Sequence, residues 1–223
     1  MNIVAIVQAR MGSTRLPGKS ALRIQGNPMI WHLLRRVRQA KLINKVVLAI
    51  PNEPNIGPLL ESADNLNINV DIWFGNPNDL IGRYVRAADR AAADLIVRVP
   101  GDNPCVDPDE IDRIIRLHLN SDWKYVSSNL DQNILANGYP GGLGAEVWNR
   151  SFLEWLDKTV TFPMLREHPH LSAYANNVVI TCDCPAEFAY PHLRFDVNTL
   201  EDFQRIENIY STAPRNFRSK DLV

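Results

Sequence analysis

Short apolar runs alternate with helical patterns through the first half of the chain, and this alternation limits the fold more than any other feature. The runs are rich in valine and isoleucine, as buried strands are, and they fall at residues 3–7, 45–50, 70–74 and 94–99. Segments with helical spacing of apolar residues follow them, at residues 28–40, 56–65, 76–92 and 107–119. Strands that are each followed by a helix form a mostly parallel sheet with helices on both faces.

The second half of the chain is less regular. Strands are predicted at residues 125–128, 144–148, 177–181 and 193–197, and helices at residues 163–174 and 199–210. The last helix has Thr199 and Asp202 at the spacing of a capping box. Because these strands do not alternate with helices, we expect a mixed sheet there. No linker rich in glycine or serine divides the chain, so a single domain over residues 1–223 is expected.

The loop at residues 8–19, directly after the first predicted strand, is rich in groups that bind an anion. It carries three cations, two hydroxyls and two glycines, namely Arg10, Arg15, Lys19, Ser13, Thr14, Gly12 and Gly18. Open α/β sheets bind ligands at the carboxyl ends of their strands. Glycines let backbone N–H groups close on a phosphate, and cations neutralise its charge. The loop therefore predicts a polyphosphate site, with a solvated basic turn as the alternative.

This loop does not have the spacing of a P-loop. Gly18, Lys19 and Ser20 resemble the end of that motif, but the position that should carry its first glycine is Ser13. Leu16 and Pro17 also stiffen the segment where a P-loop backbone must curl. An ordinary P-loop nucleoside triphosphatase is therefore disfavoured.

Two aspartates at the ends of predicted strands are candidate ligands of a divalent cation. Asp102 follows residues 94–99, and Asp196 lies at the end of residues 193–197. Mg²⁺ bound to a nucleotide is held by one or two carboxylates together with phosphate oxygens. If the two strands are neighbours, both aspartates and the cationic loop form one phosphate–metal site. The alternative for Asp102 is a turn residue, because it stands among glycine, asparagine and proline.

Composition argues against several classes of protein. The 223 residues carry a formal net charge of −1, so no global field draws the chain to nucleic acid or to an anionic membrane. No segment approaches the ~20 apolar residues of a membrane span, and the first apolar run ends too soon for a signal peptide. Cys105, Cys182 and Cys184 lack the spacing of a zinc site, and we expect reduced thiols in a cytoplasmic protein.

Five stretches of the chain, in order, resemble the acylneuraminate and KDO cytidylyltransferase family, and within it the spore-coat polysaccharide biosynthesis protein F type. The first and most specific is the loop itself, QARMGSTRLPGK at residues 8–19. The others are NDLIGRY at residues 78–84, RVPGDNP at 98–104, YPGGLGAEV at 139–147 with REH at 166–168, and RFDVNTLED at 194–202. The resemblance covers almost the whole chain.

The resemblance implies a nucleotide-diphospho-sugar transferase fold, which is a Rossmann-like three-layer α/β/α sandwich with a mixed, mostly parallel sheet. It implies transfer of CMP from CTP to an acidic sugar of the nonulosonic acid type, with release of pyrophosphate, for the biosynthesis of a surface polysaccharide or glycan. CTP and the sugar acid would be the partners and Mg²⁺ the cofactor. Members of the family are often homodimers.

By position, the resemblance also implies roles for individual residues. The nucleotide would be bound by Gln8, Ala9, Arg10, Gly12, Ser13, Arg15, Lys19 and Arg83. The acceptor would contact Tyr139, Glu146 and His168, and Asp102 and Asp196 would hold Mg²⁺. Lys19, Arg10 and Asp102 would act in catalysis.

The departures from the family pattern lie on the acceptor side, so they leave the sugar open more than the chemistry. They are Pro100, the Pro169-His170-Leu171 continuation after His168, and the glycine-rich run at residues 141–144. A guanylyl- or other nucleotidyltransferase acting on a sugar phosphate remains an alternative. A metal-dependent glycosyltransferase of similar fold is another, although such enzymes tend to carry an Asp-x-Asp pair, and the second position after Asp102 is Pro104. A non-catalytic nucleotide-binding protein is the third.

Overall fold

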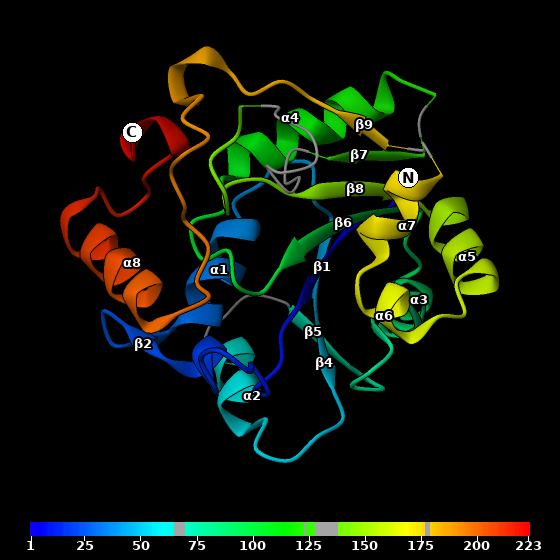
Figure 1. Ribbon diagram of the computed structural model, residues 1–223, viewed down its shortest axis with the longest axis horizontal. Coiled ribbons are helices and arrows are strands. Elements are labelled where there is room, and N and C mark those ends of the chain that lie inside the picture. The colour runs from blue at the N-terminus through cyan, green and yellow to red at the C-terminus, as the bar shows by residue number, and fades with distance from the viewer. Residues whose placement is uncertain (65–69, 123, 128–137, 177–178) are drawn as a thin grey trace.

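A seven-stranded mixed sheet forms the centre of the protein (Figure 1), whose computed structural model describes residues 1–64, 70–122, 124–127, 138–176 and 179–223. The strand order is β5 (Val70–Gly75), β4 (Lys45–Pro51), β1 (Ile3–Gln8), β6 (Leu95–Pro100), β8 (Glu146–Asn149), β7 (Tyr125–Ser127) and β9 (Val179–Thr181). Only β8 among these strands runs antiparallel to its neighbours, β6 and β7. The predicted mixed, mostly parallel sheet is confirmed.

Helices cover both faces of this sheet because the side chains of each strand alternate between them. Ala5 and Val7 of β1 pack in one apolar cluster with α1 (Met29–Val37), α2 (Gly57–Asp64) and α4 (Pro108–Leu119). Val4 and Ile6 pack in a second cluster on the other face, with α3 (Leu80–Ala91) and α5 (Arg150–Thr159). The chain therefore forms the predicted three layers (Figure 1).

A third apolar cluster joins the C-terminal part of the chain to the start of α1. It contains Phe203 and Ile206 of α8 (Leu200–Thr212), with Phe195, Phe217 and Met29. The capping box predicted for α8 is present, because Thr199 accepts a hydrogen bond from the Asp202 N–H and Asp202 accepts one from the Thr199 N–H. This packing fixes the segment before α8 beside the sheet edge.

The structure corrects the prediction at several elements. Residues 193–197 form no strand and make only an isolated bridge between Gly141 and Arg194. The helix predicted at residues 163–174 is two helices, α6 (Pro163–Glu167) and α7 (Pro169–Ala175), because proline disfavours a helical conformation at the residue before it, here His168. The helix predicted from residue 76 begins only after its N-cap, Asp79. Ser128 and residues 177–178 of two predicted strands lie outside the described residues.

Among the elements that the structure describes, a helix and a hairpin were not predicted. The helix α5 follows β8 directly, and a short hairpin joins β2 (Arg23–Ile24) to β3 (Asn27–Pro28). The hairpin turn has positive φ angles at Gln25 (48°) and Gly26 (82°), which suit a tight two-residue turn.

The edge where β1 and β6 end brings the two main sequence motifs together. Gln8 pairs with Pro100 at the last position of the two strands. A Cβ on the next residue, Gly101, would lie 2.2 Å from the Gln8 carbonyl oxygen, so only glycine fits there. This close approach sets Asp102 beside the cationic loop. Within the described residues, no helix is long and apolar enough to cross a membrane.

Candidate active site

A cavity of about 290 Å³ opens at the carboxyl ends of β1 and β6. Most of the residues with a predicted role in binding or catalysis line it: Gln8, Ala9, Arg10, Ser13, Arg15, Lys19, Arg83, Asp102 and His168. Thr14, Ser20, Leu80, Arg98, Pro100, Gly101, Glu167 and Asn198 complete the lining. Gly12, Tyr139, Glu146 and Asp196 were also predicted to belong to the site and are not part of the wall.

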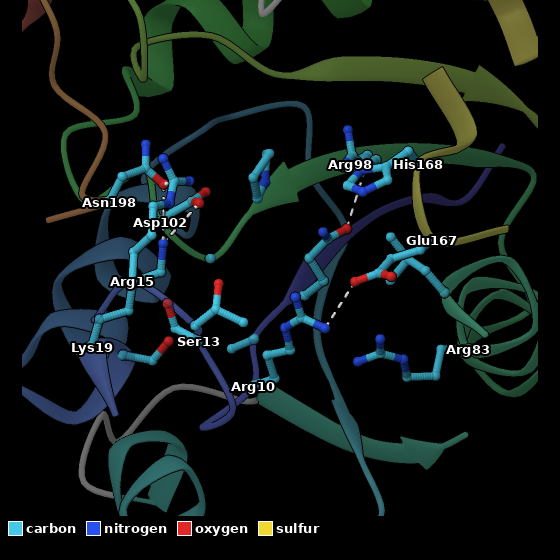
Figure 2. A pocket seen from close by; sticks show the side chains of 17 residues that line it. Arg10, Ser13, Arg15, Lys19, Arg83, Arg98, Asp102, Glu167, His168 and Asn198 are labelled. Carbon is cyan, nitrogen blue, oxygen red and sulfur yellow. Dashed lines mark hydrogen bonds and ion pairs between the residues drawn. The ribbon is translucent and has the colours of Figure 1, made fainter. Parts of the chain in front are cut away.

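One end of the cavity is built around the ammonium group of Lys19 (Figure 2). Gly18, in the left-handed conformation at φ 71°, turns the chain into the short helix η1 (Lys19–Ala21). Lys19 Nζ then donates to Asp102 Oδ2 at 3.1 Å, to the Val197 carbonyl at 2.6 Å and to Asn198 Oδ1 at 3.4 Å. The pairing of Lys19 with Asp102 shows that the loop and the carboxylate share one site.

Asn198, rather than Asp196, reaches the cavity from the segment before α8. Arg15 Nη2 donates to Asn198 Oδ1 at 2.8 Å. Both carboxylate oxygens of Asp196 accept from Arg194 at 2.8 Å, and Oδ2 also accepts from Asn198 Nδ2 at 2.6 Å. The predicted meeting of the Asp102 and Asp196 carboxylates in the cavity is therefore not seen, because Asp196 lies behind Asn198 in an ion pair with Arg194.

The floor of the cavity contains a buried ion pair that the sequence analysis missed. Arg98 of β6 donates from Nε to Gln8 Oε1 at 3.1 Å, and its Nη1 is paired with Glu146 of β8. Tyr84 of α3 donates to the same Gln8 oxygen at 2.8 Å. Burial lowers the pKa of Arg98, but the Glu146 carboxylate, together with Tyr84, Tyr125 and Asp102, more than offsets this, so the pKa lies above its ordinary value. Glu146, predicted to contact the acceptor, thus supports the floor from below.

The other end of the cavity carries further cations. Arg10 Nη1 donates to Glu167 Oε1 at 2.9 Å, and His168 follows Glu167 at the end of α6. Arg83 projects from α3, whose N-cap Asp79 is bound by Arg166 at 2.8 Å. Figure 2 shows Arg10, Glu167 and Arg83 together at this end, away from Lys19 and Asp102.

Tyr139 lies outside the cavity, in a separate buried cluster. Its hydroxyl donates to Glu110 Oε2 at 2.6 Å and is in contact with Arg113, which also donates to both Glu110 oxygens. Burial raises the pKa of Glu110 to about 7, although Arg113 acts in the opposite direction. Tyr139 serves this cluster, so the acceptor role predicted for it has no support in its position.

Glu110 should make stability depend on pH. A carboxyl group with an ordinary pKa of 4.5 that rises to about 7 on folding binds more protons in the folded state, so stability falls as pH rises between these values. In Glu110→Gln this loss should be absent. Urea unfolding of both proteins at pH 5 and pH 8 measures it, and the wild type should lose on the order of 2 kcal/mol relative to the variant. A relative gain by the wild type would contradict the assignment.

Three cavity residues of functional interest were not predicted, although the sequence around each of them contains a signal. Arg98 interrupts an otherwise apolar strand, which is unusual for a buried segment. Glu167 stands next to the predicted His168, and Asn198 directly precedes Thr199 of the predicted capping box. In each case the residue type was visible but its neighbours in space were not.

Comparison with known proteins bears on this geometry. A sequence model of the cytidylyltransferase family matches residues 4–182. The spore coat polysaccharide biosynthesis protein SpsF of Bacillus subtilis is 29% identical over 95% of this chain and 88% of its own length. The 3-deoxy-manno-octulosonate cytidylyltransferase of Geobacter sulfurreducens is 34% identical over a shorter stretch, 52% of this chain and 44% of its own length.

The fold also has a near relative among solved structures. A cytidylyltransferase from Leptospira borgpetersenii superposes with a TM-score of 0.87 at 29% identity, over 100% of this chain and 92% of its own. The family match spans most of the chain and includes the loop, Lys19, Arg98 and Asp102. The chain belongs to the cytidylyltransferase family.

Proposed function

We propose that the protein transfers CMP from CTP to an acidic sugar with release of pyrophosphate. The observation that carries this proposal is the contact between Lys19 and Asp102 at the cavity end where Arg15 and Ser13 also lie. Cations and a carboxylate at one sheet edge suit a triphosphate and its metal ion. The relatives named for spore-coat polysaccharide and for 3-deoxy-manno-octulosonate support an acidic sugar as acceptor.

The residues around Lys19 fit a divalent cation. Within the described residues, no group of three or more His, Cys, Asp or Glu side chains is placed to hold a metal, so the substrate would have to supply the other ligands. The Asp102 carboxylate, the Asn198 amide oxygen and the Val197 carbonyl already converge on the charge of Lys19. These are the hard oxygen donors that Mg²⁺ prefers. We assign the metal to Asp102 and Asn198, with Asp196 orienting the Asn198 amide.

The chain's own residues would contribute position and charge to the reaction. Lys19 and Arg15 would bind the pyrophosphate that leaves, and Ser13 would donate a hydrogen bond to the phosphates. Gln8, fixed by Arg98 and Tyr84, would hold one side of the substrate, which keeps the attacking oxygen in line with the leaving group. A metal ion on Asp102 would, when bound, neutralise charge on the reacting phosphate.

Pyrophosphate release tests the function directly. The purified full chain is incubated with CTP, GTP, UTP or ATP, each against sugar acids, including 3-deoxy-manno-octulosonate, and against sugar phosphates. We expect pyrophosphate only when CTP is combined with a sugar acid. Release with GTP and a sugar phosphate would identify the alternative nucleotidyltransferase. If no combination releases pyrophosphate, the proposed function is wrong.

A further inference from the structure

Arg83 is a buried cation that forms no ion pair within the described part of the chain. The residue is only 5% exposed, and it forms no ion pair with any described residue. Its Nε is buried without a hydrogen-bond partner, and its Nη2 reaches only the Pro77 carbonyl, at 3.4 Å. Asp79, at the start of the same helix, is committed to Arg166 by two contacts of 2.8 and 3.2 Å. Burial has the largest effect on the pKa of Arg83 and lowers it, and the charge of Arg10 acts in the same direction, while Tyr84, Glu53 and Asp79 offset only part of this.

Such an arrangement is unfavourable for the fold alone. Taking a guanidinium out of water without a carboxylate or a full set of acceptors costs free energy that packing does not return. The side chain nevertheless lines the cavity instead of turning to solvent. A ligand that brings a negative charge into the cavity would supply the missing partner.

The neighbouring cation, Arg10, has a partner that a ligand can replace. Arg10 Nη1 and Glu167 Oε1 are 2.9 Å apart, and both side chains are more than a third exposed, at 45% and 38%. Exposed pairs of this kind contribute little to stability, so separating them is easy. Glu167 and Arg10 both line the cavity. The Glu167 carboxylate therefore already lies at the end of the cavity that carries Arg10 and Arg83 (Figure 2).

We propose that Arg10 and Arg83 form a subsite for a substrate oxyanion, separate from the Lys19 and Arg15 end, and that Glu167 is its internal occupant until substrate binds. The oxyanion comes either from the nucleotide phosphate next to the nucleoside or from the carboxylate of the acceptor. The choice of these two sources rests on the proposed function. The subsite itself rests on the unpaired charge of Arg83 and the replaceable partner of Arg10.

Calorimetric titration of the full chain tests the subsite with three probes: CMP, 3-deoxy-manno-octulosonate and inorganic pyrophosphate. In Glu167→Gln, which removes the competing charge, the responding probe should bind about two- to fivefold more tightly. In Arg83→Met the same probe should bind about 10- to 100-fold more weakly. Pyrophosphate binding should not depend on Arg83, because the Lys19 end receives it. Glu154→Gln is the matched control, since it neutralises another exposed glutamate, 48% against 38% for Glu167, that is paired with Arg150 on α5.

Thermal unfolding separates this proposal from a structural role of Arg83. Arg83→Met should keep or raise the melting temperature, because it removes a buried charge that no described carboxylate pairs with in the free protein. A clear loss of melting temperature would mean that Arg83 supports the fold, and would overturn the proposal.

The probes also identify the source of the oxyanion. A response of CMP alone indicates the nucleotide phosphate, and a response of the sugar acid alone indicates the acceptor carboxylate. If neither probe binds, or neither depends on Arg83 and Glu167, the subsite does not exist. Failure of the proposed function would appear separately, as absence of pyrophosphate release by the wild-type protein.

Discussion

Asp102→Asn is expected to lower the rate of pyrophosphate release about 10²- to 10³-fold while leaving the fold intact. The amide keeps the size of the side chain and one oxygen, but it removes the negative charge that would hold a divalent cation against the triphosphate. The Asp102 side chain is 32% exposed, and Lys19 keeps the Val197 carbonyl and Asn198 Oδ1 as acceptors, so the variant should lose at most about 1 kcal/mol of stability. Steady-state kinetics with CTP and a sugar acid measure the rate, and urea unfolding measures the stability.

Asp71→Asn provides a matched control for this experiment. Asp71 has the same exposed fraction as Asp102, 32%, and is paired with Lys45 at 2.6 Å, but it lies on β5 away from the cavity. It should lose as little stability as Asp102→Asn and keep its activity. Turnover of Asp102→Asn close to that of Asp71→Asn would show that Asp102 holds no catalytic metal.

Glu146→Gln is expected to destabilise the protein by about 3–5 kcal/mol. The Glu146 and Arg98 side chains are 3% and 7% exposed, so the substitution leaves a buried guanidinium without a counter-ion. Domains of this kind are stable by only about 5–15 kcal/mol in total, so the loss should be evident. Urea unfolding at neutral pH measures it.

A second substitution shows whether the buried charge is the cause. Adding Arg98→Met removes the stranded cation, and the double variant should recover most of the lost stability while Gln8 loses its fixed orientation. Glu154→Gln, in the exposed pair with Arg150, should change stability by less than about 1 kcal/mol. A double variant as unstable as Glu146→Gln alone would place the cause in packing instead of charge.

The parallel half of the sheet could be predicted because its signals are local. In β1, β4, β5 and β6 an apolar run is followed by a helical pattern, and each strand is found within about two residues of its predicted bounds. The second half could not be predicted equally well, because it depends on contacts between distant segments. Residues 193–197 have the composition of a strand, but a single bridge, between Arg194 and Gly141, pairs them with a neighbouring segment. Phe195 and Val197 then pack against α8.

The contrast between local signals and contacts of distant segments also explains which parts of the candidate site could be predicted. The cationic loop and Asp102 could be placed together because parallel strands end at one edge of a sheet. Arg98 and Glu146 could not be paired, because the sequence does not say that β8 lies antiparallel beside β6. Glu167 lines the cavity as the last residue of α6, which ends before Pro169. Asn198 lines it in place of Asp196, whose carboxylate is paired with Arg194.

The most direct test of the proposed site is a crystal structure of the protein with CTP and Mn²⁺, in which anomalous scattering locates the metal. We expect manganese on the Asp102 carboxylate and the Asn198 amide oxygen, with the outer phosphates against Lys19 and Arg15. Manganese bound elsewhere, or a nucleotide outside the cavity between β1 and β6, would contradict it.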